Sequence, residues 1–362
     1  MDPSSPLLVA FGIPTVDFSF LVSDKSVIDK HNLQMDSQHE KTTAFLDGLK
    51  NEFYERQYEF KKITGGNSQI SSMIFQSLLK VPYQTVMCGA VGDDDEGIEM
   101  DKSLSKKLVK TSFDKLETQR SAATVIIVHK SSRTVAATNG AGEVYSTRNW
   151  KNMETHLNLV RSSSLVLFEG FFIGFSSDIV SKVVESCNLY GTVVAMNLSG
   201  SYVAKKYSQQ LLDCLKNSDI LIGNRGEFDL FCSSVGMLPH LASLADRVKA
   251  VHRMMTDHSV PKHRMRGAEQ WKKILIVTNN KDPIYCAYGD GILLRFPVPT
   301  LPEAKIVDTC GAGDSFLGAF LYALVKQKPI EKCLEIGCAV SSSVIQCHGY
   351  EIDEITLKKY AA

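Results

Sequence analysis

The chain has 362 residues, of which 44% are hydrophobic, and its 40 Lys and Arg balance 40 Asp and Glu. Because the net charge is zero, no overall electrostatic field attracts the chain to nucleic acid or to an anionic membrane. The longest apolar runs are strand-length, which argues against a membrane-spanning helix, and the nine cysteines include no C-x-x-C pair that would suggest zinc or a disulfide framework. We expect a cytoplasmic monomer that acts on small molecules, without nucleic acid or membrane as a partner.

Short apolar segments alternate with helical segments along most of the chain. A helix with one apolar face is predicted over Gln69–Leu79. The predicted buried strands are Leu7–Ile13, Thr85–Val91, Leu165–Phe168, Thr192–Met196, Ile220–Ile222 and Ile274–Val277. This alternation favours an α/β fold with a mainly parallel central sheet flanked by helices. Ligands of such a sheet bind at the carboxyl ends of its strands.

Two parts of the chain depart from this alternation. The segments Asp17–Val22, Thr124–His129 and Thr134–Ala137 are typical of antiparallel hairpin strands. With the polar stretch His31–Lys62 they predict a small β lid on a single domain of residues 1–362, built from approximately residues 17–62 and 118–140. The basic stretch Arg247–Lys273 is interpreted as a solvated helix and loop in preference to a nucleic-acid patch.

The most informative motif runs from Asp308 to Phe316 and reads Asp-Thr-Cys-Gly-Ala-Gly-Asp-Ser-Phe. It is predicted to connect a strand, Ala304–Val307, to an apolar helix. Small residues at such a turn leave backbone N–H groups free at the positive end of the helix, where a phosphate can bind. An acid in the first turn, Asp314, is favoured there in its ionised form. A phosphate cradle beside a carboxylate indicates phosphoryl transfer to a hydroxyl.

Other interpretations of this glycine-rich turn fit its spacing less well. A dinucleotide site requires G-x-G-x-x-G early in a strand–helix–strand unit, whereas here the final position is Phe316 and the motif lies near the C-terminus. A Walker loop requires Gly-Lys-Ser or Gly-Lys-Thr, and the chain contains neither. The remaining alternative is that Asp314 serves only as a helix cap.

The same motif carries a resemblance to a known family. It matches D-T-x-G-A-G-D-x-F, the C-terminal signature of the ribokinase-like (pfkB) sugar and nucleoside kinases, at every fixed position. Three further motifs of that family are present. Its Gly-Gly motif appears as Gly65-Gly66, and its G-x-x-G-x-D-x-x-G turn appears as Gly89, Gly92, Asp94 and Gly97. Its N-x-x-E motif appears as Asn224 and Glu227. The resemblance covers nearly the whole chain and implies a ribokinase-like fold, ATP as phosphate donor and a requirement for Mg²⁺.

Within this family the chain resembles the adenosine kinases. It shares with them Gly170-Phe171-Phe172 after a strand, Asn197-Leu198-Ser199, and a lid segment that begins at Arg133. The resemblance implies transfer of the ATP γ-phosphate to the 5′-hydroxyl of adenosine, giving ADP and AMP as in purine salvage. Two alternatives stay open: the same chemistry on another nucleoside or a ribose-like sugar, and a nucleotide-binding relative with little turnover.

The resemblance also assigns roles at the phosphoryl end of the site. Asp314 is expected to act as the general base that takes the proton of the acceptor hydroxyl. The backbone amides of Gly311, Ala312 and Gly313 are expected to stabilise charge on the moving phosphoryl group. Arg133 would reach that group from the lid, although an isolated arginine is more often a surface charge.

On the acceptor side, Asp17 corresponds to the acid that binds the ribose 2′- and 3′-hydroxyls; its alternative is a surface turn. The pair Gly65 and Gly66 would let the backbone approach the sugar closely. Phe171 is expected to stack on the purine, with Tyr202 a weaker candidate, and core packing is the alternative for Phe171.

Three expected substrate positions differ from the adenosine kinases. Ile13 and Ile70 stand where those enzymes carry asparagines, and Asn139 stands where they carry a leucine that packs on the base. Each lost hydrogen bond to a buried polar atom weakens binding by about 1 kcal/mol or more. The motifs therefore support kinase chemistry more strongly than they support adenosine as the acceptor.

The nucleotide side is expected to involve Asn224, Glu227 and Thr278. By resemblance, Asn224 and Glu227 organise Mg²⁺ and the triphosphate, with Glu227 acting through water because Mg²⁺ keeps much of its hydration shell. Thr278 begins a nucleotide-side T-x-G motif that reads Thr278-Asn279-Asn280 in this chain. Asn224 and Glu227 could instead form only a helix cap.

Overall fold

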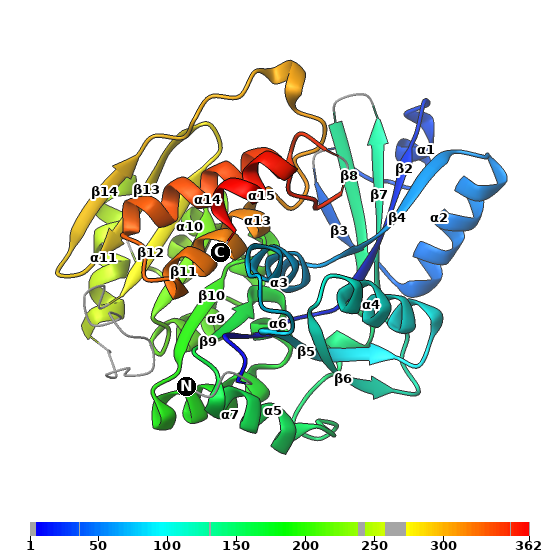
Figure 1. Cartoon of the computed structure of the whole chain (residues 1–362). Helices are drawn as coiled ribbons and strands as arrows, with labels where there is room; N and C mark the ends of the chain where they lie inside the picture. Colours follow the sequence, from blue (N-terminus) through cyan, green and yellow to red (C-terminus); the bar gives the residue numbers. More distant parts are fainter. Residues whose placement is uncertain are drawn as a thin grey trace.

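The computed structural model of the protein describes residues 5–35, 37–129, 132–237, 243–257, 273–347 and 349–361. Over these residues the chain forms a nine-stranded sheet, in the order β14-β13-β12-β11-β10-β9-β1-β5-β6, and a separate five-stranded sheet (Figure 1). Neighbours in the larger sheet pair in parallel, except at β12–β13 and β13–β14. Its strands are β1 (Leu8–Phe11), β5 (Thr85–Gly92), β6 (Lys110–Leu116), β9 (Leu165–Glu169), β10 (Val193–Asn197), β11 (Ile220–Asn224), β12 (Ile274–Asn279), β13 (Asp282–Tyr288) and β14 (Ile292–Phe296).

Helices cover both faces of the larger sheet, so the predicted α/β fold with a mainly parallel central sheet is confirmed (Figure 1). One face carries α5 (Met153–Ser162), α6 (Gly170–Phe175), α7 (Ser177–Tyr190), α8 (Ser201–Lys206), α9 (Ser208–Leu215), α10 (Arg225–Ser234) and α11 (Leu244–Asp257). The other carries α3 (Asn67–Leu78), α4 (Asp95–Lys106), α13 (Ala312–Val325), α14 (Ile330–Val344) and α15 (Glu354–Tyr360).

Burial on both faces explains why β1 is apolar at every position. Val9 and Phe11 pack into the core that includes residues of α5 to α11, whereas Leu8 and Ala10 pack into the opposite core with α3 and α13. Strands of a parallel sheet that is covered on both sides need such continuous apolar runs. The strand order reverses at β1, which lies between β9 and β5. Ligands of open α/β sheets bind outside the carboxyl ends of the strands at such a point.

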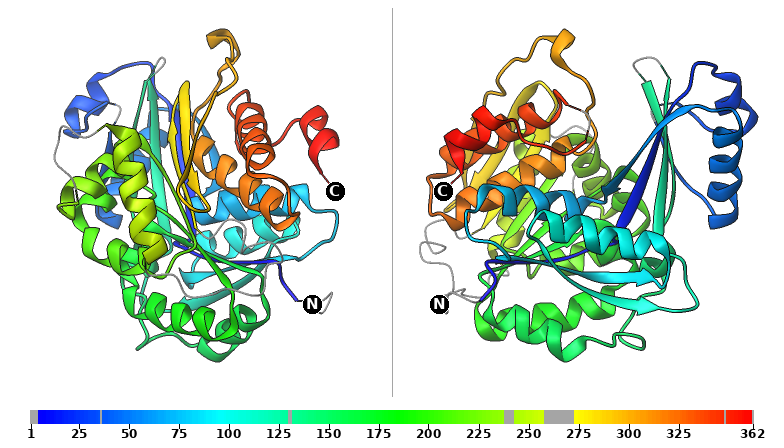
Figure 2. Two further views of the ribbon diagram at one scale, coloured as in Figure 1. Left: turned by 90° about the vertical axis from the view of Figure 1, so that its left-hand side faces the viewer. Right: turned by 45° about the vertical axis from the view of Figure 1, so that its right-hand side comes forward.

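The five-stranded sheet begins where the chain leaves β1, and it projects from the body of the molecule (Figures 1 and 2). Its order is β3-β8-β7-β2-β4. Its strands and its two covering helices are β2 (Thr15–Leu21), β3 (Gln38–Glu40), β4 (Glu59–Gly65), β7 (Ala122–His129), β8 (Ser132–Thr138), α1 (Ser26–Lys30) and α2 (Thr43–Glu55). β7 and β8 form the predicted antiparallel hairpin, but β2 pairs with β7 in parallel and with β4 in antiparallel orientation.

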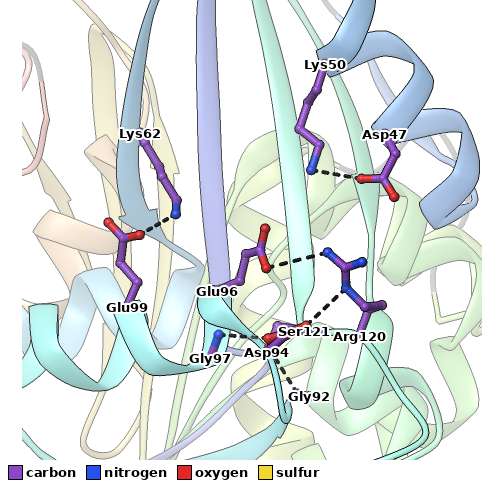
Figure 3. Close-up of polar contacts among 10 residues, drawn as sticks. All are labelled: Asp47, Lys50, Lys62, Gly92, Asp94, Glu96, Gly97, Glu99, Arg120 and Ser121. Atoms are coloured by element: carbon purple, nitrogen blue, oxygen red, sulfur yellow. Dashed lines mark hydrogen bonds and ion pairs between the residues drawn. The ribbon is translucent and has the colours of Figure 1, made fainter.

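Asp94, the N-cap of α4, fixes the junction where the chain passes from the larger sheet to the smaller one (Figure 3). Its carboxylate accepts hydrogen bonds from the backbone of Ser121 at 2.7 Å and of Gly97 at 2.9 Å, and the Ser121 hydroxyl accepts from Gly92 N at 3.0 Å. Arg120 Nε lies 3.3 Å from the same carboxylate. Since Ser121 immediately precedes β7, the G-x-x-G-x-D-x-x-G turn anchors the entrance to the smaller sheet.

The predicted strand Ala304–Val307 is wrong. A 3₁₀ turn, η2 (Glu303–Lys305), is followed by irregular chain and by a turn at Cys310 and Gly311 before α13. Ile306 and Val307 are 39% and 46% exposed, so their apolar character reflects no buried sheet position. The helix after the motif begins at Ala312, and Asp314 therefore lies in its first turn as expected.

The basic stretch Arg247–Lys273 is only partly described, because residues 258–272 lie outside the described part of the chain. At its start, Arg247 pairs with Asp229 at 2.9 Å on the side of α10. At its end, Lys273 is 1% exposed and pairs with Asp219 at 2.9 Å, so the expectation of a solvated residue is wrong there. A buried lysine needs such a partner. In the described ranges no helix combines the length and apolar character that crossing a membrane would require.

Candidate active site

A cavity of about 180 Å³ lies between the five-stranded sheet and the carboxyl ends of β1 and β9. It brings together most of the predicted acceptor and catalytic residues, namely Ile13, Asp17, Gly66, Ile70, Arg133, Asn139, Phe171, Gly311 and Asp314. Gly65, Ala312 and Gly313 adjoin these residues in the chain. Asn224, Glu227 and Thr278 do not line this cavity. The arrangement places the sequence motifs from both ends of the chain around one space.

The N-terminus of α13 presents unbonded backbone amides. Gly311, its N-cap, adopts a left-handed conformation with φ of +70°, which favours glycine. The Ala312 amide nitrogen lies 3.4 Å from Thr309 O, while the described residues provide no acceptor for the amides of Gly311 and Gly313. A Cβ added to Gly313 would meet no atom within 4 Å. These amides are therefore free to bind an anion at the positive end of the helix.

Asp314 projects from the first turn of α13 into the cavity. Its Oδ1 accepts hydrogen bonds from Asn67 Nδ2 at 3.0 Å and from Asn197 Nδ2 at 3.4 Å. Burial raises the pKa of Asp314 to about 8; the Asn67 amide opposes this shift, and the negative charges of Glu169 and Glu227 add to it. A carboxyl group with a pKa near neutrality can take and release a proton during turnover.

Asp17 lies in β2 at the other end of the cavity and is 7% exposed. Burial raises the pKa of Asp17 to about 6, although hydrogen bonds from Tyr350 and Thr124 favour its ionised form. A Cβ on Gly65 would lie 1.9 Å from Asp17 Oδ2, so this position requires glycine. Gly66 has φ of +86° at the start of α3. Gly65 therefore makes the space that the Asp17 carboxylate occupies, and Gly66 allows the backbone to turn into α3.

Glu169, the last residue of β9, is a site residue that the sequence analysis missed. It is 2% exposed, and its two carboxylate oxygens accept from Ile13 N at 2.6 Å and from Ser68 N at 2.9 Å. Burial raises the pKa of Glu169 to about 7, while both backbone hydrogen bonds favour the charged form. The carboxylate thus joins the chain leaving β1 to the first turn of α3, beside the cavity.

The wall near the expected base position is apolar. Ile13 and Ile70 are each 3% exposed and line the cavity, where their methyl groups offer no hydrogen-bond donor or acceptor. Phe171 also lines it and packs against Tyr202, with ring centroids 6.3 Å apart. Tyr202 itself does not line this cavity; its hydroxyl donates to Glu40 at 2.8 Å.

Arg133 and Asn139 line the side of the cavity that the smaller sheet forms. Arg133 lies in β8, and Asn139 directly follows that strand. Asn139 Nδ2 lies 3.5 Å from Glu40 Oε1, at the limit of a hydrogen bond. Arg133, in β8, pairs with Asp308 at 3.3 Å and contacts the Cys310 sulfur. The guanidinium is therefore held against the start of the C-terminal motif, next to the amides of α13.

At the predicted nucleotide side, Asn224 and Glu227 form a capping box at the start of α10. Glu227 Oε2 accepts from Asn224 N and Asn224 Oδ1 accepts from Glu227 N, both at 2.9 Å. Burial raises the pKa of Glu227 to about 7. Thr278 stands opposite Asn224 in the β11–β12 register, so both lie at adjacent strand ends. Asn224 and Glu227 therefore form the helix cap that was the alternative interpretation. The second carboxylate oxygen of Glu227 and the side-chain nitrogen of Asn224 take no part in this cap.

The acids near Asp314 bear on whether this site fits a divalent cation. The described residues contain no group of three or more His, Cys, Asp or Glu side chains that could hold a metal directly. However, the charges of Glu169 and Glu227 both raise the pKa of Asp314, so the two acids lie within electrostatic range of it. A cation held through water by Glu227 and by nucleotide phosphates fits this arrangement, because Mg²⁺ typically keeps several waters.

Several other residues of the site lacked a sequence signal or had a weak one. Glu169 is an acid that ends an otherwise apolar buried strand, which is a usable signal for a ligand-side residue. Asn67 directly follows the Gly-Gly pair. Tyr350 and Cys310 line the cavity, yet nothing in the pattern around Tyr350 indicates that it reaches Asp17.

Comparison with known proteins decides the family. Residues 41–356 match the profile of the pfkB family carbohydrate kinases. The chain belongs to this family. It is therefore an ATP-dependent kinase, and the kinase prediction is confirmed at the level of the family.

Individual pfkB relatives agree with this assignment. Adenosine kinase 1 of Arabidopsis thaliana is 29% identical over 346 residues, with 95% of each chain covered. The structure of an adenosine kinase from Schistosoma mansoni with 2-fluoroadenosine has a TM-score of 0.83 at 20% identity, covering 98% of both chains. A probable sugar kinase from Rhizobium etli has a TM-score of 0.79 at 18% identity, covering 97% and 96%. These structural similarities confirm the ribokinase-like fold.

Proposed function

We propose that this pfkB kinase transfers the γ-phosphate of ATP to the 5′-hydroxyl of adenosine, giving ADP and AMP. The observation that carries the proposal is the position of Asp314. It lies in the first turn of α13 beside the free amides of Gly311 and Gly313, in the same cavity as Asp17. A group that can take a proton, an anion site and a hydroxyl-binding acid are the parts that such a transfer requires. The Arabidopsis relative named as an adenosine kinase supports adenosine as the acceptor.

The residues divide the chemical step between them. Asp17 orients the acceptor through its hydroxyls, and Gly65 leaves room for the Asp17 carboxylate, with Gly66 beside it at the start of α3. As the acceptor oxygen bonds to the γ-phosphorus and the bond to the ADP oxygen breaks, Asp314 takes the hydroxyl proton. The free amides at the start of α13 face the charge that develops on the phosphoryl oxygens.

Arg133 and the nucleotide-side residues complete the proposal. Arg133 neutralises the phosphoryl group from the smaller sheet, which acts as a lid built from approximately residues 17–62 and 118–140. Asn224, Glu227 and Thr278 hold the nucleotide side, with Mg²⁺ bound through water near Glu227. When bound, Mg²⁺ supplies charge neutralisation for the triphosphate. The protein works as a cytoplasmic monomer on small molecules alone.

A second candidate function is the same transfer to another nucleoside or a ribose-like sugar. Ile13 and Ile70 favour it, because their buried methyl groups cannot hydrogen-bond a purine nucleoside. The similar fold of a probable sugar kinase supports this candidate, because one fold can serve different acceptors.

One assay tests both candidates. Purified protein is incubated with Mg-ATP and a panel of nucleosides and sugars, and ADP release and the phosphorylated product are followed. AMP from adenosine supports the proposal, whereas turnover of another acceptor alone selects the second candidate. ATP binding without turnover of any acceptor would instead identify a nucleotide-binding relative.

A further inference from the structure

The protein holds the Asp314 carboxylate by only one of its two oxygens. Oδ1 accepts from the side-chain amides of Asn67 at 3.0 Å and of Asn197 at 3.4 Å. A carboxylate oxygen has two acceptor positions, so these two amides occupy both positions on Oδ1. In the described part of the chain Oδ2 has no hydrogen-bond partner, and it is not a buried unsatisfied atom. Because Asp314 lines the cavity, Oδ2 is the oxygen that stays open to a ligand.

The backbone that carries Asn67 is fixed by contacts with other segments. Asn67 is the first residue of α3. The amide of Ser68 donates to Glu169 at 2.9 Å, and the side chain of Gln69 accepts from Thr15 N at 2.8 Å. These two bonds tie the first turn of α3 to the end of β9 and to the start of β2. The Asn67 side chain therefore projects from an anchored turn.

The same helix also holds the backbone of Asp314. Ser71 Oγ donates to the carbonyl oxygen of Asp314 at 3.0 Å. Asn67 and Ser71 lie on one face of α3, because residues four positions apart are neighbours on a helix surface. A Cβ on Gly318 would lie 2.4 Å from Ser71 O, so the backbones of α3 and α13 are in close contact there. One face of α3 thus positions both the main chain and the side chain of Asp314.

The bond from Asn67 also affects the charge of Asp314. An amide that donates to a carboxylate favours the ionised form. Burial raises the pKa of Asp314 to about 8, and the Asn67 amide opposes this rise more strongly than the Asn197 amide does. Without Asn67, a smaller fraction of Asp314 would be ionised near neutral pH.

We propose that Asn67 is a positioning residue that holds Asp314 through Oδ1 and leaves Oδ2 to face the acceptor hydroxyl. The inference rests on the proposed function, because it concerns how the proposed base is held. Asn67 acts only through Asp314 and takes no proton itself. A reacting group that is held in one orientation avoids unproductive geometries, which is why such a residue affects the rate.

The first test is the dependence of kcat on pH in Asn67→Ala, followed as ADP release with Mg-ATP and adenosine. We expect kcat at pH 7 to fall about tenfold, the size of one hydrogen bond to a charged group. The gap from wild type should narrow as pH rises above 8, because the carboxylate then ionises without the amide. The matched control is Asn158→Ala on the exposed face of α5, which removes a carboxamide that bonds Arg161 and should keep the wild-type profile.

A second variant keeps the shape of the side chain. Asn67→Asp replaces the donor by a carboxyl group and adds a negative charge beside Asp314, so the profile should move further in the same direction. This variant decides the matter where Asn67→Ala folds poorly. A loss of kcat by the same factor at every pH, or a wild-type profile in both Asn67 variants, overturns the inference.

A measurement without turnover separates this inference from the proposed function. In ligand-free protein labelled with ¹³C-aspartate, the carboxyl signal of Asp314 is identified by its absence from Asp314→Asn and is followed by NMR against pH. In Asn67→Ala it should titrate at higher pH than in wild type. If it does so but no acceptor yields ADP, the contact stands and the kinase proposal falls. If adenosine is phosphorylated but the titration is unchanged, the kinase proposal stands and the role of Asn67 is overturned.

Discussion

The two ends of the cavity are built in different ways. At the phosphoryl end, the amides of Gly311 and Gly313 have no acceptor among the described residues, and space is open beside Gly313. At the acceptor end, the protein's own Tyr350 already bonds Asp17, and Ile70 adds apolar bulk. The first end is laid out for an anion, whereas the second is partly filled before any ligand binds.

This difference separates the chemistry of the site from its selectivity. A phosphate cradle is made mainly of backbone amides at a helix start, so it depends on a short contiguous motif. Acceptor recognition depends on side chains from distant segments, and it can change without disturbing the cradle. Similarity to kinases therefore identifies the reaction more firmly than it identifies the hydroxyl that receives the phosphate.

The largest effect is expected from Asp314→Asn, which tests the phosphoryl end directly. Loss of the proposed general base should lower kcat on the order of 10²–10⁴-fold, while the amides proposed to face the phosphoryl group are retained. ADP release gives kcat, and calorimetry gives the affinity for ATP. The control is Asp178→Asn on α7, outside the cavity. Turnover within tenfold of wild type in Asp314→Asn would remove this residue from the role of base.

The pH dependence is expected to follow the raised pKa values of the site. Because the ionised carboxylate of Asp314 is the proposed base, kcat should rise about tenfold per pH unit until pH reaches the Asp314 pKa of about 8. Stability should change in the opposite sense, since raised folded-state pKa values mean that the neutral acids favour the fold. That contribution is complete below pH about 4 and is lost as pH rises through about 6 for Asp17 to about 8 for Asp314.

Rate measurements on the purified protein and thermal unfolding across this range check both statements. A rate that is flat between pH 6 and pH 8 would contradict the assignment of Asp314, whose pKa lies at about 8. An unfolding temperature that rises steadily over the same range would contradict the inferred burial of ionisable acids.

A smaller effect is expected from Glu169→Gln, which tests whether the two ends are electrostatically linked. A glutamine can accept from only one of the amides of Ile13 and Ser68, so the unfolding free energy should fall by about 1–3 kcal/mol. Removing the negative charge should also lower the pKa of Asp314, since Glu169 raises it. The rate–pH profile should therefore shift to lower pH. Loss of stability without that shift would leave Glu169 a structural residue only, and exposed Glu154→Gln serves as the control.

The smallest effect is expected from Glu40→Gln, at the edge of the acceptor end. Glu40 in β3 bonds the Tyr202 hydroxyl at 2.8 Å and Lys206 at 3.4 Å, which links the smaller sheet to α8. Exposed pairs of this kind contribute at most about 1 kcal/mol, so KM for the acceptor should change by about fivefold or less. Steady-state kinetics measure it, with Glu59→Gln on exposed β4 for comparison. A large loss of kcat would mean that this link controls the chemical step.

The sequence predicted those parts of the fold and site that depend on local patterns. Asp314 and the glycines before it are neighbours in the chain, and the buried strands are short continuous apolar runs. The strand Ala304–Val307 was a wrong prediction, because an apolar pair in an exposed extended segment resembles the end of a strand. Local patterns also could not predict the direction of strand pairing. β2 pairs with β7 in parallel, and this direction follows from the arrangement of the whole sheet.

The missed residues act through contacts between distant segments. Asn67 and Asp314 are 247 residues apart, and Tyr350 and Asp17 are 333 residues apart. Apolar residues that recur every two or 3.6 positions indicate strands or helices, but they do not indicate contacts between distant segments. Glu169 was detectable in principle, as an acid at the carboxyl end of a buried strand, but its partners, Ile13 and Ser68, follow from the tertiary structure alone.

The contact between Tyr350 and Asp17 also has a consequence for how the molecule is made. It joins two residues that are 333 positions apart, so a ribosome must synthesise the chain at least through Tyr350 before the pocket can be completed. Closing such a long loop has a large entropic cost that local contacts do not share. We expect nascent chains released before residue 350 to form much of the strand and helix framework while lacking a finished catalytic centre.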